Sequence, residues 1–127
     1  MMLPDDRRYS SEHEWVRPEG EEGVIGLTTF AASELGDIVY IELPALGTTL
    51  TQFASFGVVE SVKAVSDLFA PAGGTVVAVN ETLRTQPELM NSDPHGDGWI
   101  CRITLSSPAE LDALLDAAAY GNLIGLE

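Results

Sequence analysis

Apolar and polar residues alternate with a period of two up to about residue 80, and β-branched residues are frequent in the same stretches. Such alternation is typical of strands that turn one face toward a core and the other toward water. The pattern predicts a mainly β fold. The predicted strands cover residues 14–17, 23–27, 38–42, 56–62, 68–70, 75–79 and 99–105.

Two short helices are also predicted. Thr28 can cap a helix over residues 29–35, and Gly36 can end it by adopting a left-handed conformation. A C-terminal helix is expected over residues 108–119, because residues 107–110 combine a capping box with a proline at the first helical position. Its apolar face would consist of Leu111, Leu114, Leu115 and Ala118.

The chain of 127 residues fits a single domain, residues 1–127, with one modest core. Residues 1–8 are expected to form a short leader and residues 121–127 a tail. The N-terminal residues lack the apolar stretch of a secretory signal and are too acidic for a mitochondrial transit peptide. No apolar run approaches the length of a membrane span, so no membrane association is expected.

Acidic residues dominate the charge, because twenty Asp and Glu against six Lys and Arg give a formal net charge of −14. Nucleic acids and anionic membranes are therefore unexpected partners, since phosphate binding needs a basic patch. Any protein partner is expected to present a basic face. The single cysteine, Cys101, excludes an internal disulfide, fits a reducing compartment and lies in an apolar stretch that predicts a buried thiol.

The chain contains one lysine, Lys63, between two predicted strands and flanked by Val62 and Ala64. A primary amine at a hairpin tip can be acylated by a carboxylic acid cofactor, which gives a mobile arm without charge at its root. Alternatively, lysine is scarce only because the composition is acidic, and Lys63 is a solvated charge. A Schiff-base lysine is disfavoured because Glu60 and Asp67 nearby favour the charged amine. A biotin site is disfavoured because its lysine is expected between methionines.

No metal site is predicted. Residues 93–98 resemble the start of a calcium loop, but the bidentate glutamate that an EF-hand needs would fall on Thr104. His13, His95 and Cys101 do not have a zinc-binding spacing. The two histidines are therefore expected to be structural or exposed.

An ordered set of motifs extends on both sides of Lys63. It consists of His13-Glu14-Trp15-Val16, Leu35-Gly36-Asp37, Glu60-Ser61-Val62-Lys63-Ala64, Pro87-Glu88-Leu89-Met90-Asn91-Ser92-Asp93-Pro94 and Gly98-Trp99-Ile100. In order and spacing this set resembles the H protein family of the glycine cleavage system, and the likeness extends from Tyr9 to Tyr120. The chain departs from the family pattern at Phe30, where a polar residue is usual, and at His95, where an aromatic residue is common. Phe30 is expected to alter a partner surface and His95 to change little.

The resemblance implies a lipoyl/biotinyl-type fold, a flattened barrel or sandwich of two small antiparallel sheets. It also implies a carrier without catalytic residues. It implies that lipoate is attached to Lys63. It also implies that a lipoate ligase, or an octanoyl or lipoyl transferase, recognises the turn around this lysine. The recognised turn would include Glu60, Ser61, Val62, Ala64 and Asp67.

Three partner enzymes follow from the same resemblance. Glycine decarboxylase, a pyridoxal-phosphate enzyme, would load the arm with an aminomethyl group, and a folate-dependent aminomethyltransferase would unload it. Dihydrolipoamide dehydrogenase would then reoxidise the arm. The alternative is an H-like protein that relays lipoyl groups to 2-oxoacid dehydrogenase complexes. We expect a monomer in the bacterial cytoplasm, or in the mitochondrial matrix if the chain is a processed eukaryotic form.

The resemblance further implies that the loaded arm docks in a cleft of the carrier itself and is sheltered there from water. Glu12, Glu14 and Asp67 are the expected acceptors for its ammonium group. If residues 12–14 form a strand, Glu12 and Glu14 project to one face and His13 to the other. Glu14 is expected to serve the arm and not the fold. Alternatively, the three carboxylates are ordinary surface charges.

Overall fold

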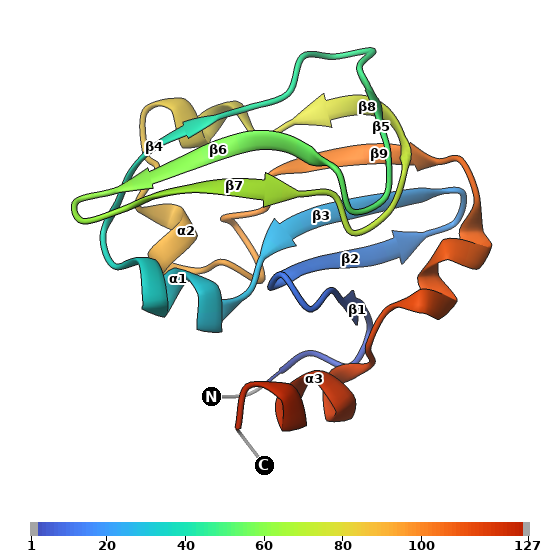
Figure 1. Ribbon diagram of the computed structural model, residues 1–127. Coiled ribbons are helices and arrows are strands. Elements are labelled where there is room, and N and C mark those ends of the chain that lie inside the picture. The colour runs from blue at the N-terminus through green and yellow to red at the C-terminus, as the bar shows by residue number, and fades with distance from the viewer. Residues whose placement is uncertain (1–2, 126–127) are drawn as a thin grey trace.

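Two antiparallel sheets of unequal size form the computed structural model, which describes residues 3–125 (Figure 1). The larger sheet has six strands in the order β1-β2-β3-β9-β8-β5, and the smaller has three in the order β4-β6-β7. The strands are β1 Arg8–Tyr9, β2 Glu14–Glu19, β3 Glu22–Leu27, β4 Ile38–Glu42, β5 Thr49–Leu50, β6 Ser55–Ser61, β7 Val65–Phe69, β8 Gly74–Val79 and β9 Cys101–Leu105. The helices are α1 Thr29–Leu35, α2 Leu89–Ser92 and α3 Ala117–Leu123, with 3-10 helices η1 Glu81–Arg84 and η2 Pro108–Ala113.

The main hydrophobic core lies between the two sheets. Ile25 on β3 and Ile103 on β9 pack in one cluster with Val59 on β6, and all three are 0% exposed. Full burial of such a side chain contributes about 1.5–3 kcal/mol to stability. Because both sheets turn an apolar face to this core, the other face of each strand remains available for other contacts.

The predicted mainly β fold of two antiparallel sheets is confirmed. The seven predicted strands correspond to β2, β3, β4, β6, β7, β8 and β9. The prediction at residues 68–70 covers only the last two residues of β7, and the one at residues 99–105 begins two residues before β9. The alternating pattern did not predict β1 and β5, because a strand of two residues is too short to show a period. These two short strands form the edges of the larger sheet.

The helix predicted over residues 29–35 is confirmed as α1. The Thr28 hydroxyl oxygen accepts a hydrogen bond from the Ala31 N–H at 3.1 Å and so satisfies one of the free donors of the first turn. Gly36 follows the helix with a φ of 83°, which residues with a Cβ rarely adopt. Local signals therefore determine both ends of α1.

The single helix predicted over residues 108–119 is wrong. The chain forms η2, becomes extended at Leu114, and starts α3 only after Asp116, whose carboxylate accepts the Ala119 N–H at 2.8 Å. Leu114 packs in the main core, whereas Leu115 packs in a second cluster and exchanges two backbone hydrogen bonds of 2.8 Å with Tyr9. A continuous helix cannot meet both requirements, so tertiary contacts override the local helix signals.

The capping box predicted at residues 107–110 is also wrong. The Ser107 side chain makes no capping hydrogen bond. Glu110 Oε1 instead accepts the Gly73 N–H at 2.8 Å, in the turn before β8. The carboxylate is therefore used for a contact between distant segments.

A second, smaller hydrophobic cluster lies on the face of β2 that points away from the main core. Trp15 and Tyr9 are both 0% exposed, and the Tyr9 ring stacks on Tyr120 with centroids 4.8 Å apart. This cluster joins β1 near the N-terminus to α3 near the C-terminus (Figure 1).

The expected leader and tail are therefore shorter than predicted. Arg8 already belongs to β1, and α3 continues to Leu123. The rest of these two predictions lies partly in residues 1–2 and 126–127, outside the described residues. Over residues 3–125, the helices are too short and too polar to cross a bilayer.

Candidate functional site

Lys63 lies in the tight turn that joins β6 to β7. The Ser61 N–H donates a hydrogen bond to the Ala64 carbonyl oxygen at 2.8 Å, which closes the turn. The Ser61 hydroxyl oxygen accepts the N–H groups of Lys63 and Ala64 at 3.3 and 3.0 Å. The lysine side chain is exposed at the tip of this hydrogen-bonded hairpin, so its amine is accessible.

Two apolar side chains lie beside Lys63 at the turn, Val62 and Val65, and each is 70% exposed. The tip of the hairpin therefore presents apolar as well as charged surface. The exposure of Lys63 also argues against a Schiff-base lysine, which is normally activated by burial or by a neighbouring cation.

A cavity of about 310 Å³ opens beside the hairpin, between α1, the start of β2, and strands β6 and β7. The three acidic residues predicted to receive the arm, Glu12, Glu14 and Asp67, all line this cavity. The fold thus brings together side chains that are far apart in the sequence. The apolar part of the lining consists of Leu27, Phe30, Ala31, Leu35, Val59, Leu68 and Phe69.

The cavity is acidic. Four Asp and Glu side chains line it, and the lining contains neither Lys nor Arg. Burial lowers the pKa of His13, so its imidazole is neutral near pH 7. A cationic group at the end of an apolar stem is the ligand that such a cavity would select. The carboxylates belong to Glu12, Glu14, Glu34 and Asp67.

Glu14 is the buried acid of this cavity, with 1% exposure. Its carboxylate accepts hydrogen bonds from the Ser10 hydroxyl at 2.9 Å and from the Phe69 N–H at 3.1 Å. Burial nevertheless raises the pKa of Glu14 to about 8, and a cation in the cavity would favour the ionised form. The bond to Phe69 ties β2 to β7, so the expectation that Glu14 has no part in the fold is wrong.

The strand geometry predicted for residues 12–14 is wrong as well. Residues 11–12 form a turn, His13 takes a φ of 76°, and β2 begins only at Glu14. The His13 N–H donates to the Ser10 carbonyl oxygen at 3.0 Å and closes the turn. The pair Ser10-Ser11 was the signal for this turn, because serine hydroxyls compete with the backbone for hydrogen bonds.

Sequence reasoning did not single out Glu34. It lies on α1 four residues after Phe30, so the two side chains share one face of the helix and both line the cavity. The Phe30 ring also packs against the His13 imidazole, with centroids 4.9 Å apart. The effect of Phe30 on a partner surface stays a prediction.

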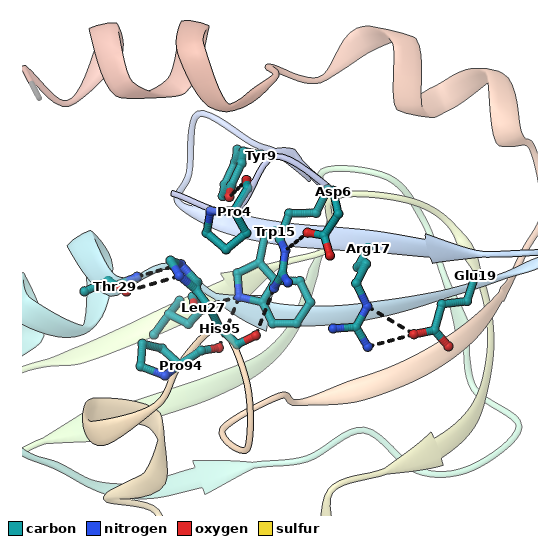
Figure 2. A network of polar contacts seen from close by, with 11 residues as sticks. Pro4, Asp6, Tyr9, Trp15, Arg17, Glu19, Leu27, Thr29, Pro94 and His95 are labelled. Atoms are coloured by element: carbon teal, nitrogen blue, oxygen red, sulfur yellow. Dashed lines mark hydrogen bonds and ion pairs between the residues drawn. The ribbon is translucent and has the colours of Figure 1, made fainter. Parts of the chain in front are cut away.

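His95 does more than the sequence indicates, because it connects the loop of residues 93–98 to the start of α1 (Figure 2). Its Nε2 atom accepts the Thr29 N–H at 3.2 Å, and its carbonyl oxygen accepts a hydrogen bond from the Arg7 guanidinium at 2.9 Å. Burial lowers the pKa of His95 to about 4, which keeps the imidazole neutral and able to accept. The spacing between Thr29 and His95 gave no sequence signal for this contact.

The remaining candidate chemistry is structural. Cys101 is 0% exposed, and burial raises the pKa of its thiol to about 12, so it lacks the thiolate that reactivity requires. Asp93 accepts the Asp97 N–H through its carboxylate at 2.9 Å and so closes a turn. Within residues 3–125, no group of three or more His, Cys, Asp or Glu side chains is arranged to hold a metal ion.

Known proteins resemble this chain over nearly its whole length. Residues 7–125 match the family model described as glycine cleavage H-protein. The chain belongs to this family. It is 59% identical over 118 residues to the glycine cleavage system H protein of Symbiobacterium thermophilum, covering 93% of this chain and 92% of the relative. It is 53% identical over 122 residues to the probable glycine cleavage system H protein of Haloarcula marismortui, covering 96% of each.

The fold agrees with a solved structure of the family. The crystal structure of a glycine cleavage system H protein from Mycobacterium marinum superposes with a TM-score of 0.89 at 36% identity, over 97% of this chain and 99% of that chain. Members of the family carry a covalent lipoyl-lysine and catalyse no reaction themselves. The chain is therefore a lipoyl carrier that shuttles the aminomethyl group in the glycine cleavage system. Membership implies glycine decarboxylase, aminomethyltransferase and dihydrolipoamide dehydrogenase as partners.

Proposed function

We propose that Lys63 is the residue that carries the lipoyl group and that the adjacent cavity receives the loaded arm. One observation carries the assignment: the family requires a lipoyl-lysine, and Lys63 is the only lysine in the sequence. Its exposed position at the tip of the β6–β7 hairpin supports the assignment, since a modifying enzyme must reach the amine without unfolding the domain.

The residues of the turn fit the group. When attached, the lipoyl group supplies a disulfide that accepts the aminomethyl group on a long, mobile arm. Ser61 holds the backbone N–H groups of Lys63 and Ala64, so the root of the arm stays fixed while the rest of it moves. Conversion of the amine to an amide removes its charge, which lets the stem lie along apolar surface.

The cavity residues then hold the cationic end of the loaded arm. The apolar wall of the cavity receives the stem of the arm. The ionised Glu14 carboxylate accepts a charge-assisted hydrogen bond from the ammonium group at the end of the arm. Such a bond contributes about 1.5–3 kcal/mol when it is partly desolvated. Glu12 and Asp67 are exposed and contribute less, because solvent screens them. The arm is thereby kept from water, which would otherwise hydrolyse the carried group.

The attachment site is tested by mass spectrometry. The protein, incubated with lipoate, ATP and a lipoate ligase, should gain the mass of one lipoyl group. Lys63→Arg keeps the positive charge but should gain none, because the guanidinium does not form the amide. Its melting temperature should match wild type, which shows that the variant is folded. A lipoyl adduct on the Lys63→Arg variant would contradict the assignment.

Further features of the molecule are proposed on the same basis. A lipoate ligase, or an octanoyl or lipoyl transferase, is expected to read the shape of the turn, since Val62 and Ala64 offer only backbone polar groups. The carrier is proposed to be a monomer, which light scattering of the purified protein tests. Bacterial relatives such as that of Symbiobacterium thermophilum support a bacterial cytoplasmic setting, and a mitochondrial matrix setting applies if the chain is a processed eukaryotic form.

A further inference from the structure

The turn that contains Lys63 rests on a segment of three residues, 36–38, which runs from the end of α1 into the first residue of β4 and which we call the platform. The Asp37 carbonyl oxygen accepts the Val62 N–H at 3.0 Å, so the platform holds the backbone of the turn. It also supports the lysine side chain, because a Cβ built on Gly36 would lie 3.4 Å from Lys63 Cε. The stem of Lys63 thus passes over a residue that has no side chain.

The stem of Lys63 passes close to a residue that adjoins the cavity. Gly36 directly follows Leu35, the last residue of α1, and Leu35 lines the cavity. A lysine stem that lies over Gly36 therefore starts at the rim of the cavity that the arm is proposed to enter. The position of the platform relative to the hairpin decides where the arm begins.

Asn91 on α2 clamps the platform at both ends. Its Oδ1 atom accepts the Ile38 N–H at 2.8 Å, and its Nδ2 atom donates to the Gly36 carbonyl oxygen at 2.8 Å. Among residues 3–125, no other side chain hydrogen-bonds to the backbone of the platform. Among side chains in their usual ionisation state at neutral pH, only the carboxamides of Asn and Gln present an acceptor and a donor side by side in this way.

The platform needs such a clamp because of its own backbone. Gly36 has a φ of 83° and a ψ of −158°, so it continues neither the helix before it nor the strand after it. Glycine can also adopt many other conformations at little cost. The two hydrogen bonds from Asn91 select one of them and thereby fix the height of the platform under the lysine turn.

We infer that Asn91 is a positioning residue for the lipoyl-lysine: acting through residues 36–38, it fixes the place and direction of Lys63 for the modifying enzyme and for entry of the arm into the cavity. This role rests on the proposed attachment of lipoate at Lys63. Asn91 does not line the cavity, and its side-chain hydrogen bonds go to the platform, so its effect is indirect. A displacement of the turn by about 1 Å is enough to lower the rate of an enzyme that must align the amine.

The chain offers a matched control, Asn80, whose Nδ2 atom donates to the carbonyl oxygens of Asp97 and Trp99 at 2.8 Å each. Asn80→Ala and Asn91→Ala each remove two hydrogen bonds to the backbone, but only Asn91 holds the platform. Two readouts separate positioning from general stability. These are kcat/KM for lipoylation by a lipoate ligase, and the hydrogen-exchange rate of the Val62 N–H, which bonds to the platform.

Asn91→Ala should lower kcat/KM for lipoylation by about tenfold and speed exchange of the Val62 N–H by a similar factor. Asn80→Ala should change both by less than about twofold, even where the two variants lose the same thermal stability. If Asn91→Ala does not fold, Asn91→Asp replaces it, since the carboxylate keeps the acceptor for Ile38 and loses the donor to Gly36.

Equal rates for the Asn91 and Asn80 variants would overturn the positioning role. That result is distinct from failure of the attachment site. If lipoate were attached elsewhere, the Lys63→Arg variant would still be modified, and the Asn91 variants would then have no bearing on the site.

Discussion

Glu14 combines a structural contact and a candidate binding contact in one carboxyl group. Its hydrogen bonds with Ser10 and Phe69 favour the charged form, whereas burial at 1% exposure disfavours it. Burial is the larger effect, because the pKa of Glu14 is raised to about 8. The sequence shows an acid before a tryptophan but neither the burial nor the two donors, so this part of the site could not be predicted.

The raised pKa of Glu14 makes stability depend on pH. Between the ordinary value of 4.5 and about 8 the native state binds one proton more than the unfolded state. The contribution of Glu14 is therefore full below pH 4.5 and is lost as the pH rises through 8. Glu14→Gln cannot ionise, so it should match wild type at pH 5 and exceed its free energy of unfolding by about 2–4 kcal/mol at pH 9. Urea unfolding at both pH values measures the difference.

The exposed Glu42 on β4 provides the control, because Glu42→Gln should follow the wild-type pH profile.

The Glu14→Gln variant should also release ammonia faster from the loaded carrier, since an amide cannot pair with the ammonium group as a carboxylate does. Equal rates of ammonia release from loaded wild type and variant would remove Glu14 from the proposed function of the cavity.

Elements differ in how far their own residues determine them. The ends of α1 follow from Thr28 and Gly36, and the sequence predicts them correctly. The prediction of one C-terminal helix is wrong because Leu114 and Leu115 pack in different hydrophobic clusters. No local sequence pattern contains this requirement. Residues 11–12 form a turn and not an extension of β2, because the serine hydroxyls before Glu12 compete with the backbone for hydrogen bonds.

The β6–β7 hairpin allows a test of how the modifying enzyme recognises its target. In the double variant Lys63→Ala with Ala64→Lys, the lysine moves by one position while the composition stays the same. Ser61 still holds the turn through the backbone, so the melting temperature should change by only a few degrees. A shift of one residue redirects the side chain, and lipoylation should be lost. Normal modification of the shifted lysine, detected by intact mass, would show that exposure alone is enough.

On the scale of the whole molecule, the sheet order depends on contacts between distant segments. β9 pairs with β3 and β8. β5 pairs with β8, although β6 and β7, which belong to the other sheet, lie between them in the sequence. Alternation predicts that strands exist but not which of them pair, so the six-stranded sheet could not be derived from the pattern. The acidic cavity depends on the same arrangement, because α1, β2 and β7 meet only in the folded chain.

The net charge of −14 predicts how the carrier finds its partners. Much of the positive charge is already neutralised within the molecule, by ion pairs of Arg7, Arg17, Arg84 and Arg102 with neighbouring acids. With partners that present the basic face expected from the sequence, long-range attraction should speed association. The kcat/KM for aminomethyl transfer to the aminomethyltransferase should fall by about tenfold as salt rises from about 0.05 to about 0.5 M.

Free aminomethylated lipoamide provides the control, because it lacks the protein's charge and should show little dependence on salt. A salt response as large for the free compound as for the carrier would place the effect in the enzyme and not in the encounter.

The three-stranded sheet leaves both of its outer strands, β4 and β7, unpaired on one side within residues 3–125. Open strands of this kind are templates for polymerisation into extended sheets. Each carries an exposed acid, Glu42 on β4 and Asp67 on β7, and the pairing of β4 is interrupted between Ile38 and Tyr40. Copies of the chain would repel and misalign at these borders. The carrier is thereby able to stay dispersed at high concentration.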